Sequence, residues 1–153
     1  MVFLLDLDGV LITTPAWRPV PVLADGFFCF NEQATANLSQ LLSETKARLV
    51  LTTSHRINYS LAQWAQFLAA RGLHPAGIAK VNAASTLAEM SRRDTEIITW
   101  VQHQEKLENY VVIDDDLSLH NLPAAIKQRC VFTKPLLGLD AEATQRVRAV
   151  LGY

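Results

Sequence analysis

The sequence predicts a three-layer α/β sandwich with a mainly parallel sheet, and two observations carry this prediction. Apolar stretches with the character of buried strands recur at residues 2–5, 49–51 and 111–113. Strands of parallel sheets are apolar throughout because helices cover both of their faces. Segments with apolar residues at helical spacing separate these stretches. Such alternation is typical of right-handed crossovers and of helices on both faces of one sheet.

Length and composition predict one compact domain over residues 1–153. Hydrophobic residues make up 50%, charged residues 19%, and the formal net charge is −1, so we expect no strong nucleic-acid footprint. A phosphorylated substrate, which needs only a local positive site, stays compatible with this charge. Cys29 and Cys130 are expected to be small apolar residues in a reducing compartment.

We also expect a cytoplasmic protein without a membrane partner. No apolar run approaches the ~20 residues of a membrane helix, and the first residues lack the basic region of a signal peptide. The sequence is compatible with a homo-oligomer.

The first predicted strand, residues 2–5, ends in two carboxylates one residue apart, Asp6 and Asp8, followed by Gly9. Ligands of open α/β sheets bind outside the carboxyl ends of the strands, so chemistry is expected here. Carboxylates this close repel each other unless a proton or a cation separates them. Oxygen ligands with excess negative charge suit Mg2+. The alternative is a solvated turn, because Asp-Gly is a common turn pair.

Residues 13–30 are expected to form an irregular loop and a small hairpin above the end of the first strand. Three prolines break regular structure in its first half, and Asp25-Gly26 precedes a short aromatic run. Trp17 and Arg18 lie in this loop. We favour packing of Trp17 onto the core, and contact of both side chains with substrate is the alternative.

A helix capped by Asn31 is predicted next, over residues 31–46, and a second strand follows at residues 49–51. The strand runs into three hydroxyl residues, of which Thr53 and Ser54 lie beyond its end. Hydroxyls and backbone N–H groups where a strand turns into a helix form an anion site. This turn is therefore a candidate for binding phosphate, although Ser54 also suits the cap of the next helix.

The middle of the chain continues the alternation. A helix over residues 59–70 stops at a glycine, a short strand covers residues 78–81, and residues 83–90 form a short helix or an ordered loop. Two arginines precede the next helix, residues 94–104, where positive charge opposes the helix macrodipole. This misfit indicates another task, such as pairing with carboxylates or phosphate, and ordinary surface charge is the alternative.

The strand over residues 109–113 ends in three consecutive aspartates, residues 114–116. After a buried strand, this is a second carboxylate cluster expected at the same edge of the sheet. A short strand at residues 131–132 and a closing helix over residues 140–151 complete the predicted fold.

Together these strand ends resemble the motifs of the haloacid dehalogenase-like (HAD-like) phosphatase superfamily. The resemblance covers nearly the whole chain and rests on Asp6-Leu7-Asp8-Gly9-Val10, Leu51-Thr52-Thr53 and Val112-Ile113-Asp114-Asp115. A finer likeness, to a small capless subgroup that includes phosphatase-like domains associated with RNA-repair proteins, rests on Ser54-His55-Arg56, residues 93–97, residues 109–116 and Leu137-Gly138-Leu139. His55 stands where that subgroup usually has tryptophan.

The resemblance implies a Rossmann-like sheet and hydrolysis of a phosphomonoester through an aspartyl-phosphate. Asp6 would be the nucleophile, and Asp8 would protonate the leaving oxygen and then activate water. Thr53 would bind a phosphoryl oxygen. Arg93, or failing it Lys80, would offset the negative charge.

The resemblance also implies the metal and further substrate contacts. Mg2+ would be held by the Asp6 side chain, the backbone carbonyl of Asp8, and Asp114 or Asp115. The remaining predicted substrate-binding residues are Gly9, Ser54, Arg56 and Lys80.

Neither usual insertion point has room for a cap domain, because only residues 13–30 and 71–90 lie there. We therefore expect an open site with a hairpin flap, whose phosphorylated substrate is a small molecule, a nucleotide or a macromolecular end. The alternative is a catalytically inactive domain with a regulatory or binding role. Clustered carboxylates argue against it, because a scaffold gains nothing from buried like charges.

Overall fold

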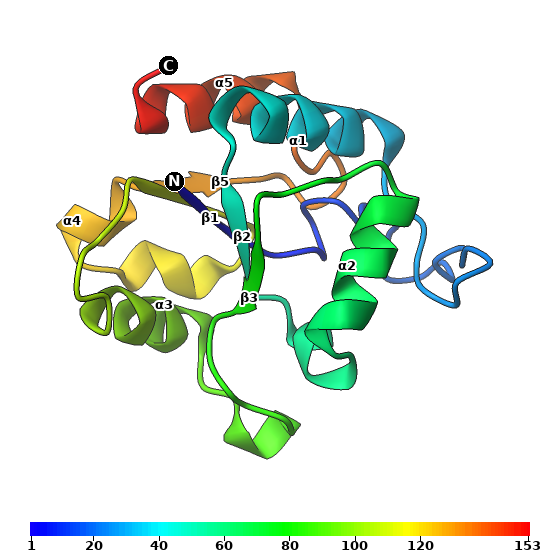
Figure 1. The fold of residues 1–153 in the computed structure, drawn as a ribbon, viewed down its shortest axis with the longest axis horizontal. Helices are drawn as coiled ribbons and strands as arrows, with labels where there is room; N and C mark the ends of the chain where they lie inside the picture. The colour runs from blue at the N-terminus through cyan, green and yellow to red at the C-terminus, as the bar shows by residue number, and fades with distance from the viewer.

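The computed structural model describes residues 1–153, with a five-stranded parallel sheet at its centre (Figure 1). The strands are β1 Val2–Leu5, β2 Arg48–Leu51, β3 Ile78–Lys80, β4 Tyr110–Asp114 and β5 Cys130–Phe132. They lie in the order β3-β2-β1-β4-β5, and every neighbouring pair is parallel. The predicted parallel sheet is confirmed.

Five α-helices surround the sheet. They are α1 Glu32–Thr45, α2 Leu61–Ala70, α3 Arg93–Gln102, α4 Ala124–Lys127 and α5 Ala141–Leu151. The caps at Asn31 and Asp140 are confirmed, because Asn31 accepts a hydrogen bond from the backbone of Ala34 and Asp140 from that of Ala143. The cap expected at Ser54 is wrong, because Ser60 caps α2 and Thr53 caps the short 3-10 helix that Ser54 begins. Helix α4 was not predicted, since four residues are too few to show a helical period.

The two faces of the sheet support separate hydrophobic cores. Helices α1, α2 and α5 cover one face, where Leu5 and the fully buried Trp64 lie. Helices α3 and α4 cover the other, where Leu4 packs with Ile97 and Trp100. Figure 1 shows α1 and α5 side by side on one side of the sheet and α3 on the other, so the three-layer sandwich is confirmed. None of the helices is both long and apolar enough to cross a membrane.

The topology places the ends of three strands at one level. From β1 the chain proceeds outward to β2 and β3, then returns to the other side of β1 for β4 and β5. The carboxyl end of β1 is therefore a topological switch point, where open α/β sheets bind ligands. Leu5 is in register with Leu51 and with Ile113. Asp6, Thr52 and Asp114 consequently emerge together at this edge.

Residues 13–30 form the predicted loop, closed by an antiparallel bridge between Val22 and Phe28. Phe27 is buried and stacks on Phe67 of α2 at 4.9 Å between centroids. The favoured packing of Trp17 onto the core is wrong, because this side chain is 75% exposed. Phe27 already fills the space between the loop and α2, which leaves Trp17 on the surface.

Candidate active site

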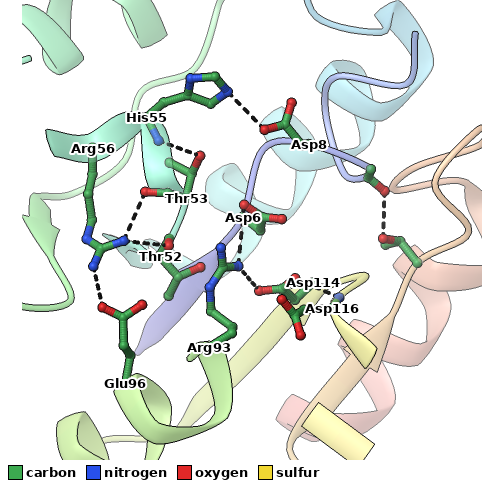
Figure 2. Close-up of polar contacts among 12 residues, drawn as sticks. Asp6, Asp8, Thr52, Thr53, His55, Arg56, Arg93, Glu96, Asp114 and Asp116 are labelled. Atoms are coloured by element: carbon green, nitrogen blue, oxygen red, sulfur yellow. Dashed lines mark hydrogen bonds and ion pairs between the residues drawn. The ribbon is translucent and has the colours of Figure 1, made fainter. Parts of the chain in front are cut away.

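Three carboxylates converge at the switch point. Asp6 follows β1, Asp114 is the last residue of β4, and Asp115 comes next. One oxygen of each lies within 4.8 Å of the others. Asp6 and Asp114 are 4% and 0% exposed. Figure 2 shows Asp6 and Asp114 on either side of the guanidinium of Arg93.

The carboxylates of this cluster are hard to ionise in the metal-free protein. Burial, followed by the charge of Asp6, raises the pKa of Asp114 to about 7. Burial and then the charge of Asp114 raise the pKa of Asp115 to about 6. Burial also raises the pKa of Asp6, whose Oδ1 atom has no hydrogen-bond partner. Clustered oxygen donors with excess negative charge and an unsatisfied atom fit a divalent cation such as Mg2+.

Arg93 is the cation that the structure brings to this cluster. It is the first residue of α3, and its Nη1 donates to Asp114 and lies 3.4 Å from Asp6 Oδ1. Burial lowers the pKa of its guanidinium, but the charges of the two carboxylates outweigh it and hold that pKa above its ordinary value. Lys80 instead donates to the backbone carbonyl of Tyr59 at 2.7 Å. The Lys80 ammonium is therefore engaged by this carbonyl and makes no ion pair with the carboxylates of the cluster.

Gly9 shapes the turn that carries Asp8. Its φ is +79°, and a Cβ atom here would lie 2.1 Å from Asp115 Oδ2, so glycine is required on both counts. Its N–H donates to the carbonyl of Ile12 at 2.8 Å, and its own carbonyl accepts from Thr133 Oγ1 at 2.7 Å. The backbone N–H of Gly9 is therefore occupied within the turn, and the contact of Gly9 with substrate stays a prediction.

The turn after β2 carries the predicted anion-binding residues. Thr53 is fully buried and its hydroxyl accepts a hydrogen bond from the His55 N–H, while Ser54 is half-buried and begins a short 3-10 helix. Thr52 was not selected from the sequence, yet its buried hydroxyl has no partner. The sequence signal that could have identified Thr52 as a site residue is its position directly after β2, which matches the position of Asp6 directly after β1.

Arg56, predicted to bind substrate, is fully buried instead. Its guanidinium pairs with the buried Glu96 of α3 and donates to the carbonyls of Thr52 and Thr53 at 3.0 and 3.2 Å. Figure 2 shows it on the far side of this turn from Asp8. Arg56 stays inside because Glu96 compensates its charge there, where an unpaired guanidinium would be costly. Through its hydrogen bonds to these two carbonyls, Arg56 fixes the backbone that follows β2.

Asp8 differs from the other carboxylates in its surroundings. Its side chain is 59% exposed and lies 2.9 Å from the Nε2 atom of His55. This contact raises the pKa of His55, against the effect of partial burial. The Asp8 carboxylate does not belong to the three-carboxylate cluster. The two aspartates of the first motif are thus a buried one and an accessible one.

A pocket of about 400 Å3 opens beside these residues. Asp8, Asp115 and Arg18 line it, together with the apolar side chains of Pro135 and Leu136. A larger hollow of about 530 Å3 lies between α1 and the end of α2, and none of the site aspartates lines it. The smaller pocket is therefore the one with direct access to the candidate site.

Comparison with known proteins yields one match. A family model described as the HAD domain in Swiss Army Knife RNA repair proteins matches residues 2–144. The match runs from β1 into α5 and includes all the site residues described above. No curated protein and no solved structure matches the chain.

Proposed function

The chain belongs to the family of HAD domains in Swiss Army Knife RNA repair proteins, and we propose on that basis that it hydrolyses phosphomonoesters with Mg2+. The observation that carries the proposal is the cluster of the buried Asp6 and Asp114 with the half-buried Asp115 at the switch point, with Arg93 beside it. A cluster of this kind costs stability in a protein that does not use it. The accessible Asp8 next to it supplies a second, chemically different carboxylate.

In the proposed first step, an oxygen of Asp6 attacks the phosphorus atom in line with the leaving group. A bond forms between that oxygen and phosphorus, and the bond between phosphorus and the leaving oxygen breaks. Asp8 in its protonated form donates its proton to the leaving oxygen. The hydroxyl of Thr53, which accepts one hydrogen bond and retains its own proton, is the proposed donor to a phosphoryl oxygen.

In the second step, water attacks the phosphorus atom of the aspartyl-phosphate. Asp8 takes the proton from this water, and the bond between phosphorus and the Asp6 oxygen breaks. Phosphate is released with Asp6 and Asp8 in their starting forms. Burial opposes the charged form of Asp6 that the attack needs, and the positive charge of Arg93 beside it offsets this effect. Asp8, whose side chain is 59% exposed, is the carboxylate that water and the leaving oxygen can reach.

The residues proposed to hold Mg2+ are Asp6, Asp115 and the backbone carbonyl of Asp8, with Asp114 nearby. When bound, Mg2+ supplies positive charge that lets an anionic nucleophile approach an anionic phosphate. Arg93 contributes to the same neutralisation from the α3 side.

Phosphate release from purified protein tests this proposal. The substrates are an aryl phosphate, a mononucleotide and an RNA oligonucleotide with a terminal phosphate, each with Mg2+ and with EDTA. We expect turnover that EDTA abolishes. If no substrate is hydrolysed and the protein also fails to bind beryllofluoride with Mg2+, a mimic of the aspartyl-phosphate, the inactive alternative is favoured.

The Asp115→Asn variant is expected to change stability in opposite ways without and with metal. Because the pKa of Asp115 is raised from 3.8 to about 6, the folded state binds more protons than the unfolded chain between these two pH values. Stability therefore falls as pH rises through this range. At about pH 8, removal of the charge should raise the free energy of unfolding of the metal-free protein by about 1 kcal/mol after solvent screening. This corresponds to a rise of about 2–4 °C in its melting temperature.

Thermal melts with and without Mg2+ complete this test. Mg2+ should stabilise the wild type at about pH 8 and much less at about pH 5, where Asp115 is protonated. It should stabilise Asp115→Asn little at either pH. Asp116→Asn is the control, because Asp116 caps a 3-10 helix outside the cluster and asparagine keeps that cap. An undiminished Mg2+ effect in Asp115→Asn would remove this residue from the metal site.

The rim of the pocket supports a polynucleotide end as the preferred substrate. Arg18 lines the pocket, and its guanidinium lies 4.6 Å from the centroid of the exposed Trp17 ring. Proteins that bind single-stranded nucleic acids stack the unpaired bases on exposed aromatic side chains. Neighbouring cationic side chains of the protein contact the backbone phosphates. The open pocket leaves room for such a chain.

Trp17→Ala and Arg18→Ala are expected to lower kcat/KM on the phosphorylated oligonucleotide. Loss of one stacked base costs about 1–3 kcal/mol, which corresponds to about 5- to 150-fold. Activity on the aryl phosphate should stay unchanged, and Leu87→Ala, another exposed apolar side chain, serves as the control. Equal losses on both substrates, or a preference of the wild type for a phosphopeptide, would refute this assignment.

A further inference from the structure

His55 makes the one polar side-chain contact of Asp8. Its Nε2 atom lies 2.9 Å from Asp8 Oδ2, and Figure 2 shows the imidazole directed at this carboxylate from the turn after β2. The Asp8 side chain is 59% exposed, whereas that of His55 is 23% exposed. An exposed carboxylate without a partner would sample several rotamers. The contact with His55 selects one of them.

The imidazole itself is fixed by aromatic neighbours from the hairpin. It packs edge-on against Phe27 at 5.8 Å and against Phe28 at 5.6 Å between ring centroids. The hairpin is in turn held by Arg71 of the α2 end, which donates to Asp25 at 2.7 Å and to the carbonyl of Phe28 at 2.9 Å. The orientation of His55 is therefore set by packed and bonded groups.

We propose that His55 is a positioning residue that holds the Asp8 carboxyl group for proton transfer to the leaving oxygen. With a proton on Nε2, the imidazole donates to Oδ2 and leaves Oδ1 of Asp8 for the exchange with the leaving group and with water. This inference rests on the proposed function, because it assigns a role within that reaction.

Packing alone does not require an imidazole at this position. A phenylalanine would make the same edge-on contacts with Phe27 and Phe28, but it has no group that can donate to Asp8. The chemistry of the contact, rather than the volume of the ring, distinguishes histidine here. A misplaced general acid loses rate because proton transfer depends on its alignment with the leaving oxygen.

The test uses His55→Phe, which keeps an aromatic ring, and His55→Gln, whose amide nitrogen can take the place of Nε2. For both variants and the wild type, kcat/KM is measured on phosphate esters whose leaving groups range from nitrophenol to an alkyl alcohol. An alkoxide leaving group needs protonation and a nitrophenolate does not. His55→Phe should lose about 10- to 100-fold on the alkyl ester and little on the nitrophenyl ester. His55→Gln should recover much of this loss.

A double-mutant comparison and a fold control complete the design. In an Asp8→Asn background, His55→Phe should cause no further loss on the alkyl ester, because the two residues act as one unit. If His55→Phe does not fold, His55→Leu replaces it, since leucine is close to glutamine in size and donates no hydrogen bond.

The outcomes separate this inference from the function on which it rests. Equal losses on all esters, or no loss on any, would overturn the positioning role while the phosphohydrolase assignment stands. Absence of turnover by the wild type on every ester would overturn the proposed function, and the role of His55 with it.

Discussion

The Asp6→Asn substitution is expected to lower kcat by about 10⁴-fold or more while the protein stays folded. An amide oxygen is a poor nucleophile and cannot form the aspartyl-phosphate. The fold should tolerate the change, because burial already raises the pKa of Asp6 and disfavours its charged form. A neutral side chain of the same shape relieves this cost. Phosphate release and a circular dichroism melt measure the two effects separately.

Asp116→Asn provides the matched control for this variant. Asp116 lies next to the cluster in sequence, but its carboxylate caps the backbone of Ser118. Its replacement should change activity by less than about tenfold. If Asp6→Asn retained activity within tenfold of the wild type, Asp6 could not be the nucleophile.

Arg93→Ala is expected to impair stability and activity together. The side chain is 11% exposed and offsets the charges of Asp6 and Asp114. Its removal leaves two buried carboxylates without their cation, which costs about 3–5 kcal/mol in free energy of unfolding. Turnover should fall by about 10²- to 10³-fold, because positive charge beside the nucleophile is lost. Urea unfolding and phosphate release measure these losses.

Two other cations serve as controls for this prediction. Arg92 is the preceding residue and is 67% exposed in its pair with Asp94, so Arg92→Ala should cost about 1 kcal/mol or less. Lys80→Ala should keep most of the activity, since Lys80 bonds the Tyr59 carbonyl. If Lys80→Ala lost activity and Arg93→Ala kept it, the charge would come from β3 instead. Saturating Mg2+ should restore part of the stability of Arg93→Ala, because it offsets the same carboxylates.

Local sequence signals predicted most of the fold. Strands β1, β2 and β4 are apolar runs that end in polar residues, and helices α1 and α5 begin at the capping residues Asn31 and Asp140. These signals lie within a few residues of the element they specify. Helix α4 has four residues and a 3-10 segment before it, and neither is long enough to show periodicity.

The candidate site was predictable to the extent that it lies at strand ends. Asp6 and Asp114 each appear at the end of an apolar run, so the switch-point rule finds them without coordinates. Thr52 has a buried hydroxyl without a hydrogen-bond partner, and its place beside Asp6 follows only from the register between β1 and β2, which the sequence does not show.

Contacts between residues far apart in the sequence could not be predicted. Arg56 is buried because Glu96, forty residues later in the chain, pairs with it. Trp17 is exposed because Phe27 takes the place beside α2. The contact of His55 with Asp8 also joins residues far apart in sequence. A single sequence shows the residue types in such pairs but not which residues meet.

Acid quenching during turnover shows whether Asp6 carries the phosphoryl group. The protein is mixed with labelled substrate and Mg2+ and quenched in acid during turnover. One portion is assayed for label bound to the protein. A second portion is reduced with borohydride, which converts an aspartyl-phosphate to homoserine with release of phosphate, and is mapped by peptide mass spectrometry. We expect labelled protein in the first portion and homoserine in place of Asp6 in the second, and more of both in Asp8→Asn with an aryl phosphate, because slower hydrolysis lets the intermediate accumulate. Turnover by the wild type without phosphorylated protein in the wild type or in Asp8→Asn, or homoserine at another position, would exclude Asp6 as the phosphoryl carrier.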